Sequence, residues 1–217
     1  VLTTPAITLL KQYRPDVRVG VVIEPRFAGV YEDNPDIDAI LAPTFSAAAG
    51  YGARLVLNLH GGTRSMALTL ASLARLRAGF THYRAQWIYN VHIPRAQQIL
   101  GEERVAHTAE HVASAMFYLG VPQSEIPRAR LVARPGEVPA GDYAVIHPTA
   151  SAAHKAWPTE RFAQLGAALR ARGLEPVFIG AATDDLSAFA DFRIVRGANL
   201  SEVKTLLVGA RLFVGND

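Results

Sequence analysis

The segment from His147 to Pro158 holds the densest set of side chains that could bind an anion. It contains the hydroxyls of Thr149 and Ser151 and the ammonium of Lys155. It also lies between an expected strand and an expected helix, so backbone N–H groups and the helix dipole would add to the positive charge. These features favour binding of a phosphate or diphosphate, although an ordinary exposed loop with a solvated lysine contains the same residue types.

A second polar loop, residues 180–185, follows the next expected strand. A carboxylate about one turn beyond a strand end, here Asp184, can accept hydrogen bonds from ribose hydroxyls. Alternatively, Thr183 or Asp184 simply caps the following helix.

A third loop, residues 60–65, ends a strand in the first part of the chain. Its two glycines, Gly61 and Gly62, allow close approach to the backbone. The planar guanidinium of Arg64 could then bind a phosphate or carboxylate through two parallel hydrogen bonds. The alternative is a tight turn with a surface arginine.

His107, Glu110 and His111 have the order of an inverted zinc-protease motif. No third ligand is evident nearby, so a helix face with exposed or capping histidines is the preferred interpretation, and no metal site is predicted. The sequence contains no Gly-x-Ser-x-Gly, Walker or Gly-x-Gly-x-x-Gly motif.

The elements that must position these loops alternate between strand-like and helix-like segments. Helices are expected over residues 4–13, 65–76, 103–119, 159–172, 184–190 and 201–210, and strands over 17–23, 38–41, 54–59, 143–147, 175–179 and 211–214. Strands separated by helices of this length imply parallel βαβ units with right-handed crossovers, and therefore an α/β fold.

Residues 134–142 are rich in proline and glycine and have no apolar periodicity, which is typical of a linker. We therefore predict two Rossmann-like, doubly wound domains, residues 1–139 and 140–217. The second is short, with three or four strands, and is expected to be incomplete.

Composition excludes several classes of protein. The absence of cysteine excludes disulfides and thiolate metal sites. No apolar run reaches the ~18 residues of a membrane-spanning helix. The net charge of +3 falls entirely within residues 1–140, which suits an anionic partner there but is too small to indicate nucleic-acid binding.

Together, these segments resemble the lipopolysaccharide heptosyltransferases of glycosyltransferase family 9, in the family's order and over nearly the whole chain. The matching residues are Leu2–Ala6, Asn34–Asp38, Leu57–Gly61 with Arg64 and Ser65, His147–Pro158, Leu200–Glu202 and Gly215–Asp217. The stretch His147–Pro158 is the most specific, through His147-Pro148, Ser151, Lys155 and Trp157-Pro158.

The resemblance implies a GT-B fold, in which two Rossmann-like domains face each other across a cleft. It implies metal-independent, inverting transfer of heptose from ADP-heptose to a lipid-linked Kdo or core saccharide, without a cofactor. Carried over by position, Thr149, Ser151 and Lys155 contact the diphosphate, and Lys155 stabilises this leaving group. Asp184 contacts the ribose, Asn199 lies beside the adenine, and Asp217 lies near the sugar and diphosphate. Arg64 and Ser65 face the acceptor.

The sequence also departs from the family's pattern. Asn58 stands where the family often has Asp. The expected general base, an Asp before the first helix, falls about two residues upstream of Val1, and a Ser-Gly-Pro-x-His segment is expected after Asp217. The chain as printed is therefore expected to be truncated at both ends and inactive.

Two other functions remain open from the sequence. One is a GT-B transferase that uses a different nucleotide sugar, and the other is an inactive nucleotide-binding fragment. For the heptosyltransferase, we expect a cytoplasmic protein with peripheral contact to the cytoplasmic face of the inner membrane.

Overall fold

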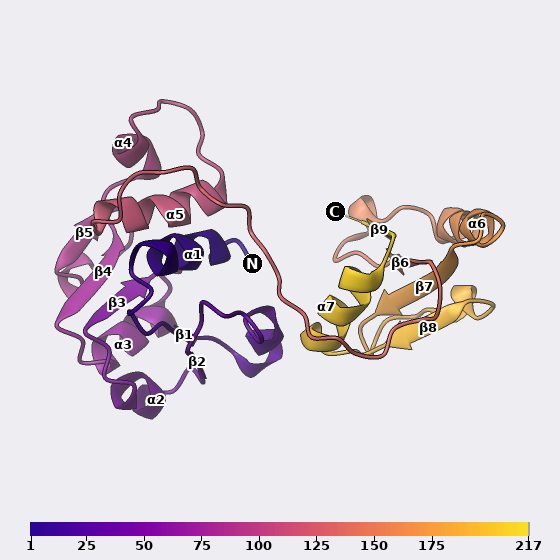
Figure 1. Cartoon of the computed structure of the whole chain (residues 1–217), viewed down its shortest axis with the longest axis horizontal. Helices are drawn as coiled ribbons and strands as arrows, with labels where there is room; N and C mark the ends of the chain where they lie inside the picture. The colour runs from indigo at the N-terminus through magenta and orange to yellow at the C-terminus, as the bar shows by residue number, and fades with distance from the viewer. Residues whose placement is uncertain (217) are drawn as a thin grey trace. The chain divides into compact units, whose positions relative to one another are not determined.

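The computed structural model describes residues 1–216, and the chain forms two compact units, Val1–Leu131 and Val132 onward (Figure 1). All strand pairs in both units are parallel within the described residues. The expected α/β class is therefore confirmed. No helix in residues 1–216 is long and apolar enough to cross a membrane.

The first unit contains two small parallel sheets covered by helices. Strands β1 (Gly20–Val22) and β2 (Ala39–Leu41) form one sheet, and β3 (Leu55–Asn58), β4 (Leu76–Phe80) and β5 (Val91–Ile93) form the other in that order. The α-helices are α1 (Thr4–Tyr13), α2 (Phe45–Gly50), α3 (Thr63–Ala71), α4 (Ala96–Leu100) and α5 (Thr108–Tyr118), with short 3-10 turns η1 (Pro25–Val30) and η2 (Gln86–Ile88).

The core of this unit lies between the second sheet and the helices α1 and α5, which run side by side (Figure 1). Leu9 of α1 and Ala113 of α5 meet Phe80 and Ile93 of the sheet in one buried cluster. Pro5 fits the first turn of α1, where a missing N–H costs nothing.

The second unit is a four-stranded sheet in the order β8-β7-β6-β9. Its strands are β6 (Tyr143–His147), β7 (Glu175–Gly180), β8 (Arg193–Arg196) and β9 (Leu212–Gly215). Its helices are α6 (Thr159–Arg170) and α7 (Leu200–Gly209), with 3-10 turns η3 (Ala153–Lys155) and η4 (Ser187–Phe189).

Alternate residues of β6 enter two separate cores, as the two-residue period of a strand requires. Ala144 and Ile146 pack with Phe162 of α6, whereas Tyr143 and Val145 pack with Leu206 of α7. The sheet therefore has apolar layers on both faces, which is the doubly wound arrangement.

The segment before β6, from Val132, belongs to the second unit because it contacts α7. The hydroxyl proton of Thr205 in α7 is shared between the carbonyl oxygens of Arg134 (3.2 Å) and Ser201 (3.1 Å), and Gly136 lies against the Thr205 side chain. The proline- and glycine-rich stretch is thus held along α7 from Arg134.

Several predicted elements were wrong in extent. The helix expected over residues 65–76 ends at Ala71, because Leu73 adopts a positive φ of 55° and β4 begins at Leu76. Strands β4 and β5 were missed, since short strands such as LRAGF and VHI carry no clear alternation. Helix α5 begins at Thr108, not near residue 103.

In the second unit, the helix expected over residues 184–190 is only the 3-10 turn η4. Strand β8, which contains Arg193 and Arg196, was not predicted. The helices α1, α6 and α7 and the strands β6, β7 and β9 were placed to within about two residues, the usual uncertainty of element ends.

Candidate functional site

The strand order of the second unit places a ligand site at the ends of β6 and β9. From β6, the chain adds β7 and β8 on one side and β9 on the other, so the order reverses between β6 and β9. Residue His147 pairs in register with Gly215, and both strands end there. Ligands of open parallel sheets bind at such a reversal, beyond the carboxyl ends of the strands.

The loop predicted to bind phosphate, residues 148–158, leaves β6 at this point. Ser151 and Lys155 are exposed, and Lys155 forms no ion pair with any residue in the described chain. The loop ends at α6, where Trp157 packs edge-on against Phe162 with ring centroids 4.9 Å apart. An exposed, unpaired ammonium near a helix N-terminus suits an anion.

Asn216 closes this loop at both ends, and sequence reasoning missed it. Its amide nitrogen donates to the carbonyl oxygen of Pro148 (2.7 Å), and its amide oxygen accepts from the N–H of Trp157 (2.9 Å). The only signal in the sequence was the Gly215-Asn216-Asp217 block. Asp217, the residue we predicted to act there, lies outside the described residues.

Two predicted residues, Thr149 and Asp184, come together across β6 and β7. The Thr149 hydroxyl donates to Asp184 Oδ2 (3.0 Å), which also accepts from the N–H of Ala181 (2.8 Å). Thr149 Oγ1 also lies 3.2 Å from His147 Nε2. Because a hydroxyl has one proton and the carboxylate can only accept, His147 must be the donor in that second bond.

The second oxygen of Asp184, Oδ1, has no hydrogen-bond donor among residues 1–216. Asp184 is half-buried, and the two hydrogen bonds to Oδ2 hold its carboxylate in one orientation while Oδ1 stays open as an acceptor. This is the arrangement needed to bind a hydroxyl of a ligand.

Asn199 is the N-cap residue that precedes α7, three positions after the end of β8, and its side chain caps that helix. Its oxygen accepts from the N–H of Glu202 (3.0 Å), and the Glu202 carboxylate accepts from the Asn199 N–H (2.8 Å). This reciprocal cap fixes the helix start. No hydrogen bond joins Asn199 to Thr149, Ser151, Lys155 or Asp184 in the described part of the chain.

In the first unit, Asn58 holds the loop after β3 through hydrogen bonds, and this residue is only 4% exposed. Its oxygen accepts from the N–H groups of His60 and Gly61 (both 3.0 Å). Its nitrogen donates to Thr69 Oγ1 (3.2 Å) and the Tyr89 hydroxyl (3.0 Å). An Asp here could not make the two donated bonds, so the amide suits this environment.

Arg64 and Ser65 follow in the first turn of α3. The guanidinium of Arg64 contacts Glu24 (2.7 Å) and the carbonyl oxygen of Pro43 (3.2 Å), which follow β1 and β2. It therefore ties together the carboxyl ends of three strands. The Ser65 hydroxyl donates to the Gly62 carbonyl oxygen (2.8 Å), so it can only accept a hydrogen bond from a ligand.

The metal-binding alternative finds no support. His107 caps α5 by accepting from the N–H of Ala109 (3.2 Å), and Glu110 pairs with Arg104 (2.7 Å). The hydrogen bonds from Arg104, and then from the His107 N–H, lower the pKa of Glu110 to about 2. Among residues 1–216, no three His, Asp or Glu side chains are grouped to hold a metal ion.

His111 instead stacks on Phe80, with ring centroids 4.1 Å apart, and lies 5.5 Å from the ring of His82. Burial, and then the nearby His82, lower the pKa of His111. This histidine pair lies where β4 ends, and sequence reasoning did not predict it.

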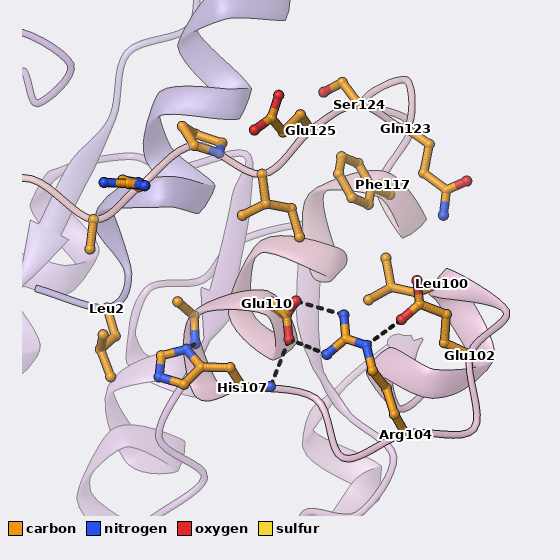
Figure 2. Close-up of a pocket in the computed structure, with 15 residues that line it drawn as sticks. Leu2, Leu100, Glu102, Arg104, His107, Glu110, Phe117, Gln123, Ser124 and Glu125 are labelled. Atoms are coloured by element: carbon orange, nitrogen blue, oxygen red, sulfur yellow. Dashed lines mark hydrogen bonds and ion pairs between the residues drawn. The ribbon is translucent and has the colours of Figure 1, made fainter.

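An open groove of about 740 Å³ lies beside α4 and α5 (Figure 2). Arg104 is fixed there between Glu102 and Glu110, near Leu100 and Phe117 (Figure 2). None of the residues predicted from the sequence to bind substrate lines this groove.

Comparison with known proteins identifies the family of this chain. The sequence model of glycosyltransferase family 9 (heptosyltransferase) matches residues 49–217. A search of curated proteins finds no significant match.

Solved structures resemble this chain over nearly its whole length. The glycosyl transferase family 9 protein from Veillonella parvula has 19% sequence identity and a TM-score of 0.79, over 99% of this chain and 70% of that one. The E. coli heptosyltransferase WaaC with ADP has 20% identity and a TM-score of 0.76, over 100% of this chain and 76% of that one. The E. coli ADP-heptose lps heptosyltransferase II has 15% identity and a TM-score of 0.71, over 100% and 75%.

At these identities the structural likeness shows the fold, which is the GT-B fold expected from the sequence. The family match is independent of it and covers most of the chain. The chain therefore belongs to glycosyltransferase family 9, the heptosyltransferases.

Proposed function

We propose that this protein transfers heptose from ADP-heptose to the lipopolysaccharide inner core. Membership of the family supports glycosyl transfer, and similar solved structures include WaaC with ADP and with ADP-2-deoxy-2-fluoro heptose. The observation that carries the proposal is the loop of residues 148–158 at the β6–β9 reversal, with an exposed Lys155 that forms no ion pair within residues 1–216.

The second unit binds the donor in this proposal. Ser151 and Lys155 hold the diphosphate, and Asp184 accepts from the ribose through its open Oδ1. Thr149 takes part through Asp184, because its only proton is already donated to that carboxylate. Asn199 lies at the adenine and Asp217 near the sugar, as the family resemblance assigns.

Displacement at the anomeric carbon leaves ADP with additional negative charge. A cation placed on the diphosphate stabilises that charge in the transition state, which is worth more than uniform binding. We assign this role to Lys155, with help from the N-terminus of α6, so that transfer needs no metal ion. Inversion of the anomeric centre follows from a single displacement, in which the acceptor oxygen forms the new bond as ADP leaves and the acceptor proton passes to the general base.

The first unit binds the acceptor in the same proposal. Arg64 presents its guanidinium at the carboxyl ends of β1, β2 and β3, and Ser65 offers a hydroxyl oxygen beside it. An acidic, lipid-linked Kdo saccharide suits the positive net charge of this part of the chain. The resemblance assigns the general base to an Asp upstream of Val1, and a place at the cytoplasmic face of the inner membrane follows from the acceptor.

The test is turnover by the full-length protein with ADP-heptose and a Kdo-lipid acceptor, beside ADP-glucose and UDP-glucose. Transfer from ADP-heptose alone supports the proposal. Transfer from another nucleotide sugar identifies a different GT-B transferase. Binding of ADP by calorimetry without any transfer identifies a nucleotide-binding protein that is not a catalyst.

A further inference from the structure

The Asn216 side chain joins the segments that leave the two strand ends at the proposed donor site. Because β6 and β9 pair in register at His147 and Gly215, the residues that follow, Pro148 and Asn216, leave the sheet side by side. The amide of Asn216 then donates to the Pro148 carbonyl oxygen and accepts from the Trp157 N–H.

These two bonds enclose residues 149–156, which include Ser151 and Lys155. The loop has few other ties: η3 is one short turn, and Ser151 and Lys155 make no side-chain hydrogen bond within the described chain. Thr149 anchors it at one end to Asp184. Trp157 anchors the other end against Phe162 but is itself 45% exposed.

We infer that Asn216 is a positioning residue that closes the loop of residues 148–157 and so preorganises Ser151 and Lys155 for a diphosphate. The inference rests on the proposed function of that loop. It assigns no contact between Asn216 and the ligand. A loop held in its binding conformation loses less entropy when the anion binds, so affinity is higher.

The two bonds also make the amide specific. The carbonyl oxygen can only accept and the N–H can only donate, so both an acceptor and a donor are needed on one short side chain. Asp at this position keeps the acceptor for Trp157 but turns a carboxylate oxygen toward the Pro148 carbonyl oxygen. Ala removes both bonds.

The matched control is Asn90, which also joins two backbone segments through one amide. Its oxygen accepts from the Arg77 N–H (2.8 Å) and its nitrogen donates to the Arg75 carbonyl oxygen (2.8 Å). It lies before β5 in the first unit, at the opposite end of the strands from the carboxyl edge. Asn90→Ala therefore removes the same two kinds of bond without touching the loop.

The experiment compares wild type, Asn216→Ala, Asn216→Asp and Asn90→Ala in the full-length protein, with ADP and adenosine as ligands in calorimetry. We expect both Asn216 variants to weaken ADP binding by about fivefold to thirtyfold, corresponding to one or two net hydrogen bonds. Adenosine binding should stay unchanged because adenosine has no phosphate. Hydrogen exchange at residues 149–156 should be faster in both Asn216 variants and unchanged in Asn90→Ala.

Equal ADP affinity in wild type and Asn216→Ala would overturn the inference. Equal losses for ADP and adenosine would also overturn it, since they would show a general defect of the unit. If wild type itself does not bind ADP, the proposed function fails instead, and the exchange measurement still decides whether Asn216 holds the loop.

Discussion

The hydrogen bond between Thr149 and Asp184 leads to a prediction that separates two roles for Thr149. By position in the family pattern, Thr149 should contact the diphosphate. In the structure its hydroxyl proton goes to Asp184, which follows a different strand. Thr149→Val keeps the shape and the β-branch of the side chain while it removes this bond.

The magnitude follows from the type of bond that is lost. A hydrogen bond to a charged group contributes about 1.5–3 kcal/mol, and the half-buried Asp184 calls for the lower end of that range. Asp184 keeps its bond from the Ala181 N–H (2.8 Å), so its orientation is loosened and not abolished. We therefore expect ADP affinity to fall by about tenfold, or about 1.4 kcal/mol.

The assay is competition of ADP and inorganic pyrophosphate against a fluorescent ADP analogue. Thr149→Val should weaken ADP about tenfold and leave pyrophosphate unchanged, because only ADP carries the ribose that Asp184 binds. Thr149→Ser retains the hydroxyl and should stay within about twofold of wild type. Equal losses of affinity for ADP and pyrophosphate would refute the reasoning and would indicate that Thr149 contacts the diphosphate directly.

Three further predictions concern single side chains. Lys155→Ala should weaken ADP and pyrophosphate alike and lower kcat by about tenfold to a hundredfold, measured by initial rates, and equal rates would remove Lys155 from the mechanism. Asn58→Asp should lower the free energy of unfolding by about 3 kcal/mol in urea, since a buried carboxylate replaces an amide that donates to Tyr89; an unchanged midpoint would contradict this. His111→Phe should keep the stack on Phe80 and remove the pH dependence of folding stability that His111 causes. Because the pKa of His111 is lowered in the folded protein, the contribution of its neutral ring to stability is present above pH 6.5 and lost as the pH falls. The variant should therefore melt at a higher temperature than wild type at pH 5.5 but not at pH 8.

The sequence by itself determined the fold class, the family and the polar loops. Alternating helices and strands, with Val and Ile at β6 and β7, suffice for a parallel α/β fold because local propensity and the position of prolines agree there. The loop after β6 was recognisable because hydroxyls, a rare lysine and the Trp157-Pro158 pair stand at fixed spacing. Such patterns depend on neighbours in the chain, which the sequence displays directly.

Elements with weak local signals could not be placed. Strands β4 and β8 contain arginines, and the end of α3 depends on Leu73 adopting a left-handed conformation, which its side chain does not favour. Their positions are decided by pairing with β3 and β7, and these partners are distant in the sequence.

The tertiary structure alone decided what each polar group is paired with. It joined Thr149 to Asp184 through adjacent strands, closed the loop with Asn216 through the register of β6 and β9, and paired Arg64 with Glu24. These contacts join residues that lie 35 to 68 positions apart in the sequence, and each rests on strand neighbours that the sequence order does not reveal. Residue types thus indicate which chemistry is available, whereas the strand order determines which groups remain free to carry it out.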